Sequence, residues 1–242
     1  MIKNKFKSSL IALYSFFKRS KRSKSIFYHD IHSSKKFTNM STSIDLFEDH
    51  IEIIQNIGFK IVPEITDDHA QIQICFDDGF KGIFENMNII NRLNVPITIF
   101  IVTSFIDKEG YLSFSQIKEL NQNPLIRIES HTHTHSDLTL FSQKELDFEF
   151  LNSKKILEDI CEKEITSICY PRGIFNDKVV DIASRIYKLQ YSSLPGNYYD
   201  EILPSVKRRS LVQFSSINNF RNILNGGDHF LYHWYKFKHF NS

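Results

Sequence analysis

Short runs of β-branched and aromatic residues alternate with longer amphipathic segments along most of this chain. The runs that read as strands are 26–29, 72–77, 97–102, 125–130, 166–170, 188–193 and 209–214. Strands that alternate with helices in this way predict an α/β fold with a largely parallel sheet. The chain has 242 residues, of which 41% are hydrophobic and 24% are charged, as expected for one globular domain with a substantial core.

Capping signals mark where several helices begin. Ser43 can cap a helix that Gly58 ends. Capping-box spacing, a serine followed three residues later by Glu or Gln, occurs at 113–116 and 142–145. Further helices are expected over 81–93, 176–187 and 216–224.

The run at 72–77 ends in two adjacent carboxylates and a glycine, Asp77, Asp78 and Gly79. Adjacent side chains on a regular strand point to opposite faces, so the two carboxylates could not share a site there. Because Gly79 lets the backbone leave strand geometry, both carboxylates can reach one pocket. The alternative is a plain Asp-Gly turn that ends the strand.

A second polar cluster follows the run at 125–130, where His131, His133 and His135 fall within five residues. Two histidines four apart lie on one side of a helical turn, close enough to hold one metal ion. With one carboxylate added, the ligands are two nitrogens and one oxygen, and one position stays open for water. That composition is typical of a catalytic zinc site.

These two clusters resemble motifs of the polysaccharide deacetylases, the NodB-homology carbohydrate esterases. Residues 76–79, Phe-Asp-Asp-Gly, are similar to the first motif, and 130–135, Ser-His-Thr-His-Thr-His, to the second. Residues 170–173, Tyr-Pro-Arg-Gly, resemble the third motif in its Tyr-Pro-x-Gly form. The resemblance covers about 26–225 and implies a distorted (β/α) barrel of about seven parallel strands. The candidate residues follow the carboxyl ends of predicted strands, which form the active-site face of such a barrel.

The resemblance also implies roles for individual residues. It makes Asp78, His131 and His135 the ligands of a divalent metal, in the simplest case Zn²⁺. It makes Asp77 the base that deprotonates water, and it gives the backbone N–H of Arg172 to the oxyanion. His133 is expected to point away from the metal.

Two departures from the family pattern leave alternatives open. Cys169 stands where most members have an arginine that is thought to brace the base, and Arg209 is a candidate substitute. The usual fourth motif, Asp-x-x-Asp-Trp, is not visible. For the general acid, residues 28–31, Tyr-His-Asp-Ile, resemble the circularly permuted poly-N-acetylglucosamine deacetylases and favour His29. The rival is His233 in Leu-Tyr-His, within an aromatic tail that begins at about 226.

We therefore expect a metal-dependent hydrolase that removes an N-acyl group, in the simplest case N-acetyl, from a sugar. The substrate would be a bacterial surface polysaccharide or its lipid-linked precursor. The rivals are an O-deacetylase or deformylase of the same fold, and a catalytically silent glycan-binding domain. A domain that only binds glycans need not keep both a free base and an open metal site, so the complete motifs argue against a catalytically silent domain.

Charge separates residues 1–24 from the catalytic domain expected over 25–242. The first 24 residues hold eight Lys or Arg and no acid, which leaves 22 basic and 28 acidic residues, or −6, elsewhere. The apolar positions form a helical stripe, and the apolar stretch is too short to span a bilayer. A signal peptide would need a small-x-small cleavage site, and this segment has no convincing one. A basic amphipathic helix on an anionic membrane surface fits better; the alternative is a frayed basic tail.

Cysteine usage bears on the compartment. Cys75, Cys161 and Cys169 are widely spaced and form no CxxC pair. We expect reduced core thiols in a cytoplasmic protein, peripheral at the inner face of the membrane if residues 1–24 bind it. No nucleic-acid partner is expected, because the clustered basic residues accompany no reading motif.

Overall fold

The computed structural model describes residues 2–17, 20–200, 206–232 and 235. Its α-helices are α1 (Ile2–Phe17), α2 (Ile44–Asn56), α3 (Gly82–Glu85), α4 (Met87–Leu93), α5 (Phe114–Leu120), α6 (Gln143–Cys161), α7 (Asp177–Ser184) and α8 (Ile217–Leu224). Its 3₁₀ helices are η1 (Thr103–Phe105), η2 (Leu138–Leu140), η3 (Pro171–Gly173) and η4 (His229–Leu231). Its strands are β1 (Lys24–Tyr28), β2 (Asp30–His32), β3 (Ser41–Ser43), β4 (Lys60–Ile61), β5 (Gln71–Phe76), β6 (Ile97–Ile101), β7 (Ile126–Ser130), β8 (Ser167–Cys169), β9 (Leu189–Tyr191), β10 (Val206–Lys207) and β11 (Arg209–Leu211).

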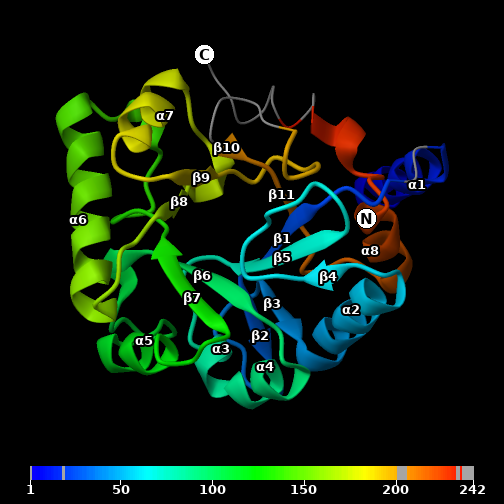
Figure 1. Ribbon diagram of the computed structural model, residues 1–242, viewed down its shortest axis with the longest axis horizontal. Coiled ribbons are helices and arrows are strands. Elements are labelled where there is room, and N and C mark those ends of the chain that lie inside the picture. The colour runs from blue at the N-terminus through cyan, green and yellow to red at the C-terminus, as the bar shows by residue number, and fades with distance from the viewer. Residues whose placement is uncertain (1, 18–19, 201–205, 233–234, 236–242) are drawn as a thin grey trace.

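A nine-stranded parallel sheet forms the centre of the molecule, in the order β10-β9-β8-β7-β6-β5-β1-β11, with β4 beside β5. The helices surround it (Figure 1). Only Arg208 separates β10 from β11, yet β10 pairs with β9 and β11 pairs with β1. The two edges of the sheet are therefore joined by one bent stretch of chain. Counted as one bent strand with β1, β5, β6, β7, β8 and β9, this stretch gives the seven strands expected of the distorted barrel.

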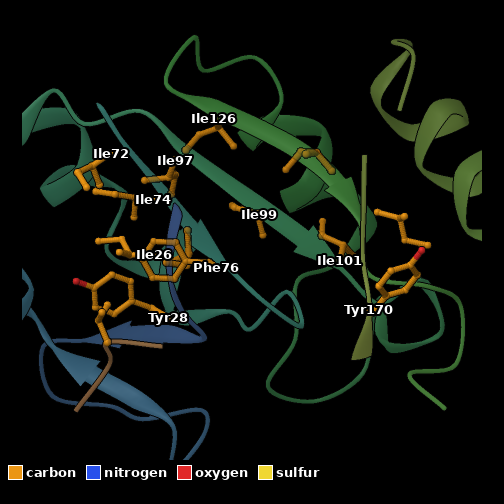
Figure 2. Packing of buried hydrophobic residues seen from close by; sticks show 14 of the residues in the cluster. Ile26, Tyr28, Ile72, Ile74, Phe76, Ile97, Ile99, Ile101, Ile126 and Tyr170 are labelled. Carbon is orange, nitrogen blue, oxygen red and sulfur yellow. The ribbon is translucent and has the colours of Figure 1, made fainter. Parts of the chain in front are cut away.

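The two faces of the strands carry different side chains. On β5, Ile72, Ile74 and Phe76 belong to the large apolar cluster between the sheet and the helices (Figure 2). Strand alternation turns the residues between them to the interior of the barrel. There Cys75 joins a smaller cluster, half of it aromatic, and Gln73 Nε2 lies 3.5 Å from Thr98 Oγ1. The interior therefore has polar groups as well as aromatic rings.

The predicted helix starts are confirmed. Ser43 accepts a hydrogen bond from the Leu46 N–H at the start of α2, and both capping boxes form, at the starts of α5 and α6. These signals are local, so the sequence alone reveals them.

Other predictions need correction. The helix expected over 81–93 is two short helices, α3 and α4, interrupted at Asn86, whose φ of −118° is not helical. The short strands β2, β3, β4 and β10 were not predicted. Strands of two or three residues carry too little periodicity to be read from one sequence.

Helix α1 lies against α8 and the η4 segment at one side of the sheet (Figure 1). Ile11 and Ser15 are buried in this contact. A side chain on Gly227 would clash with the Ile11 carbonyl oxygen and Ser15 Cβ, at 2.4 and 2.9 Å. Among the described residues, no helix combines the length and the hydropathy that crossing a bilayer requires.

Candidate active site

Asp77 and Asp78 lie directly after β5, at the carboxyl end of the strand, and both are buried. The departure from strand geometry begins at Asp78 itself, whose φ is +72°, and continues at Gly79 with φ +79°. The sequence predicted this departure at Gly79, so it begins one residue earlier than expected. As predicted, both carboxylates reach one pocket, because Asp77 and Asp78 line the same cavity.

The segment that holds His131 and His135 is a loop, which corrects the predicted helical turn. Thr132 and His135 have φ values of +67° and +62°, which no right-handed helical turn contains. The buried Glu149 carboxylate on α6 accepts hydrogen bonds from the backbone N–H groups of His133 and Thr134, each at 2.9 Å. Glu149 thus fixes the loop from behind.

Three of the predicted residues converge on one point. His131 Nε2 and His135 Nε2 lie 3.4 and 3.3 Å from Asp78 Oδ1, and these three atoms lie within 4.8 Å of one another. Asp78 Oδ1 is buried and accepts no hydrogen bond from the described residues. Tetrahedral ligands at ~2.1 Å from a zinc ion would be roughly 3.4 Å apart, so these residues fit a divalent metal.

The tautomer of His131 also suits a metal ligand. Its Nδ1 lies 2.7 Å from the Cys169 carbonyl oxygen, to which it can only donate. The hydrogen is therefore on Nδ1, and Nε2 is free to bind a metal. His133 points elsewhere, because its Nδ1 lies 2.9 Å from Thr103 Oγ1 and its ring packs on Phe148.

A second group of potential ligands, Asp77, His131 and Cys169, overlaps the first. Burial raises the pKa of the Cys169 thiol despite the nearby Arg209, so the sulfur stays protonated near neutral pH. Arg209 Nη2 also donates to this sulfur, at 2.7 Å. A protonated thiol beside a guanidinium is a poor metal ligand, and we assign the metal to the Asp78 group.

Arg209 pairs with Asp77 through two hydrogen bonds. Nη1 and Nη2 donate to Oδ1 and Oδ2 of Asp77, at 2.7 and 2.8 Å. Burial is the largest single influence and would raise the pKa of the Asp77 carboxyl, but the charge and hydrogen bonds of Arg209, together with His131 and His29, hold that pKa below its usual range. Phe27 and Phe100 flank the guanidinium, with centroids 4.4 and 5.1 Å from Cζ. Arg209, from the distant β11, therefore contacts both Asp77 and Cys169, as expected of a substitute for the arginine that Cys169 replaces.

His29 lies just after β1 and lines the cavity with Asp77 and Asp78. Its Nδ1 is 2.6 Å from Gln213 Oε1, so Nδ1 donates and Nε2 is left for other chemistry. Sequence analysis missed Gln213, because nothing marks a single glutamine as the partner of a histidine 184 positions away. The rival, His233, is outside the described residues.

Arg172 lies in the turn η3 after β8, where it and Gly173 have positive φ values of +57° and +66°. Gly173 follows it, packed so tightly that a Cβ would lie 1.9 Å from Ser193 Oγ. Arg172 lines the same cavity as the metal-binding group. The predicted residues are therefore brought together from the ends of β1, β5, β7, β8 and β11.

Comparison with known proteins identifies the family of this chain. Residues 65–190, which are 126 of the 242 residues, match the profile of the family described as polysaccharide deacetylase. YxkH of Bacillus subtilis (strain 168), which bears the name "Putative polysaccharide deacetylase", is 26% identical over 183 residues, 71% of this chain. The match spans 64% of the length of YxkH. A chitooligosaccharide deacetylase of Sinorhizobium fredii is 21% identical over 63% of this chain and 75% of its own.

Solved structures share the fold. IcaB from Ammonifex degensii superposes with a TM-score of 0.74 at 16% identity, over 86% of this chain and 99% of its own. The Streptococcus pyogenes deacetylase PplD, solved with acetate, gives 0.72 at 21% identity, over 84% and 98% of the two chains. These likenesses establish the fold expected from the sequence.

Proposed function

This chain belongs to the polysaccharide deacetylase family, and from that premise we propose that it is a metal-dependent N-deacetylase of a sugar. Its substrate would be part of a bacterial surface polysaccharide or the lipid-linked precursor of one. One observation carries the proposal. Asp77, which the Arg209 ion pair keeps ionised, lies next to three residues that fit a divalent metal.

The chain's own residues divide the steps of amide hydrolysis. A divalent ion held by Asp78, His131 and His135, in our proposal Zn²⁺, supplies Lewis acidity that acidifies water and polarises a carbonyl. Asp77 takes a proton from the attacking water as its oxygen bonds to the carbonyl carbon. The Arg172 backbone N–H donates to the oxyanion that develops.

The remaining step breaks the carbon–nitrogen bond. The amine is a poor leaving group unless it is protonated, and His29 Nε2 is placed in the same cavity to give it a proton. Gln213 supports this step because its Oε1 accepts the hydrogen bond from His29 Nδ1, which leaves Nε2 on the opposite side of the ring for the amine. Acetate and a free amino sugar are the products.

Metal analysis and acetate release test the proposal together. The purified protein should contain about one divalent ion per chain and release acetate from N-acetylated sugars. His29→Ala should keep the metal and lower turnover, while His233→Ala should do little. The reverse pattern would identify His233, in the carboxyl-terminal tail, as the general acid. Release from O-acetylated sugars alone would make the protein an O-deacetylase, and metal or sugar binding without turnover would make it a glycan binder.

We also propose that residues 1–24 contact an anionic membrane surface, on the cytoplasmic side. Leu13, Phe16 and Phe17 on α1 are exposed by 57%, 74% and 72%, in a segment with no acid and eight basic residues, of which Lys24 is buried in β1. The protein should bind vesicles that contain phosphatidylglycerol, less so as salt rises. Exchange of Phe16 and Phe17 for serine should weaken that binding. Equal binding by the exchanged protein would contradict the membrane role.

A further inference from the structure

The cavity at the active site extends well beyond the catalytic residues. Its volume is about 510 Å³, and its lining runs from Asp78 and the histidines to helix α1. The far end is formed by three elements that are distant in sequence: α1, α8 and the η4 segment. One cavity therefore joins the site of chemistry to the amino-terminal helix.

The far end carries apolar side chains beside polar ones such as Lys7 and Asn219. Ile11 from α1, Ile223 from α8 and Leu231 from η4 line it. The Asp228 carboxylate in the same wall is paired, since Lys24 Nζ donates to Oδ1 at 2.9 Å and Ser210 Oγ to Oδ2 at 2.5 Å. Its charge is thus compensated within the protein.

Exposed apolar side chains lie along the cavity between its two ends. Leu211 and Phe214 line the cavity and are 46% and 65% exposed. Apolar side chains left open to water in a cavity are typical of a site that binds an apolar group. Hydroxyl-rich sugar units would instead be matched by polar side chains.

Helix α1 is a fixed part of this wall. Lys7 Nζ donates to the Tyr235 hydroxyl at 2.9 Å, and Ser15 Oγ to Asn222 Oδ1 at 3.4 Å. Gly227 allows the η4 segment to pack directly on the α1 backbone. The far end is consequently formed by packed side chains in the described fold.

From this cavity we infer that the substrate is amphiphilic, a sugar joined to a hydrocarbon anchor. The sugar lies at Asp77 and the metal ligands, and the anchor lies along the far end against α1, α8 and η4. This inference rests on the proposed deacetylase function and selects the lipid-linked substrate over the free polymer. The exposed face of α1, with Phe16 and Phe17, would place this end of the cavity near the membrane that holds such anchors.

Two glycosides of N-acetylglucosamine, with methyl and dodecyl aglycones, test the inference on the metal-loaded protein. Both are used below the micelle concentration, with kcat/KM for acetate release and Kd by calorimetry as readouts. The dodecyl glycoside should be favoured by on the order of tenfold or more, because burying two methylene groups already has that effect.

Ser8→Phe and Ser9→Phe form a matched pair of variants. Both serines are exposed on α1, but only Ser8 lines the cavity. Ser8→Phe fills the far end, so the dodecyl-to-methyl ratio should fall toward one, while Ser9→Phe should keep the ratio of the original protein. A ratio near one in the original protein, or one that Ser8→Phe leaves intact, would overturn the inference.

Additional substrates in the same assay distinguish the remaining explanations. If the methyl glycoside of a chitotriose shows the same Ser8-dependent preference, the far end is a sugar subsite and the inference is wrong. Chain-dependent binding without acetate release would refute the proposed function and leave the amphiphilic ligand supported. A farnesyl glycoside compared with the dodecyl one distinguishes a prenyl anchor from an acyl anchor.

Discussion

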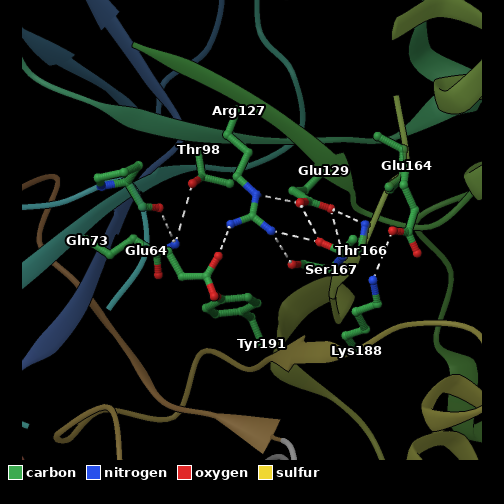
Figure 3. Close-up of polar contacts among 12 residues, drawn as sticks. Glu64, Gln73, Thr98, Arg127, Glu129, Glu164, Thr166, Ser167, Lys188 and Tyr191 are labelled. Atoms are coloured by element: carbon green, nitrogen blue, oxygen red, sulfur yellow. Dashed lines mark hydrogen bonds and ion pairs between the residues drawn. The ribbon is translucent and has the colours of Figure 1, made fainter. Parts of the chain in front are cut away.

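In the described part of the barrel interior, Arg127–Glu129 and Arg209–Asp77 are two pairs in which the carboxylate is buried, although the Arg127 side chain is 27% exposed. The two pairs differ in how the carboxylate is used. Near the amino ends of the strands, Arg127 Nε donates to Glu129 Oε1 at 2.6 Å (Figure 3). Glu129 Oε2 accepts from the backbone N–H groups of Ser167 and Thr166, at 2.7 and 3.0 Å. Both oxygens of Glu129 are thus engaged, and the carboxylate ties β7 to β8, which share only one paired position, Ser130 with Ile168.

At the carboxyl ends, Asp77 accepts two hydrogen bonds from Arg209 and also lines the cavity. Oδ2 also accepts from the Cys169 thiol at 3.9 Å, so Oδ1 is the oxygen with more capacity to accept a proton from water. The balance of burial and charge also differs between the pairs. Burial raises the pKa of Glu129 more than Arg127 lowers it, whereas at Asp77 the lowering by Arg209, His131 and His29 together exceeds the rise caused by burial. A carboxylate paired with an arginine can thus serve the structure or serve catalysis. Which of the two it serves depends on whether its remaining lone pairs accept hydrogen bonds from the protein or are open to the cavity.

The largest expected effect is that of Asp77→Asn on turnover. The amide cannot take a proton from water, so kcat should fall by a factor on the order of 10²–10⁴. The metal should stay bound, because Asp77 is not among the ligands, and elemental analysis checks this. Loss of metal together with activity would mean that Asp77 and Asp78 have exchanged roles.

Arg209→Met removes the partner of a fully buried carboxylate, and the free energy of unfolding should fall by about 3–5 kcal/mol. In the original protein the pKa of Asp77 is lowered, so its stabilisation is present above the unfolded pKa of ~3.9 and is lost only at more acidic pH.

Without Arg209, burial raises the pKa of Asp77 above the unfolded value, and the carboxyl then destabilises the fold increasingly as pH rises from about 4. Thermal unfolding should show a larger deficit for Arg209→Met at pH 8 than at pH 5. The acidic limb of the pH–rate profile should also move to higher pH. A deficit that is constant with pH would contradict the pairing.

A smaller effect, on stability alone, is expected from Glu129→Gln. The amide keeps one acceptor oxygen but loses the charge that Arg127 faces, so unfolding should require about 1–3 kcal/mol less. Turnover should remain within a factor of ~3, because Glu129 does not line the cavity. A loss of kcat as large as that of Asp77→Asn would remove the distinction between the two pairs.

The smallest effect is expected from Glu64→Gln, which serves as the control for Glu129→Gln. Glu64 also pairs with Arg127, at 2.6 Å from Nη1, but its side chain is 46% exposed. Exposed pairs contribute little, so Glu64→Gln should change the free energy of unfolding by less than ~1 kcal/mol. Denaturant unfolding of both variants measures the contrast. Equal losses would show that exposure does not separate the contributions of these two carboxylates.

The sequence by itself determined the order of strands and helices, their caps and the residues that end the strands. These features depend on neighbours a few positions away, as the Ser113 and Ser142 capping boxes show. The motifs around Asp78, His131 and His135 were likewise visible, because each lies within a short segment. The interruption at Asn86 and the loop that contains His135 were not, since local periodicity there resembles a continuous helix.

Only the tertiary structure decided which distant side chain meets which. Arg209 reaches Asp77 across 132 positions, and Gln213 meets His29 across 184. A single sequence contains no register between strands, and an arginine or glutamine looks the same whether it faces water or a buried partner. The bend at Arg208, which joins the two edges of the sheet, turns Arg209 inward, and α1 completes the cavity from outside the barrel. Burial and pairing are properties of three-dimensional neighbours, so the chemistry of Asp77 was fixed by the fold.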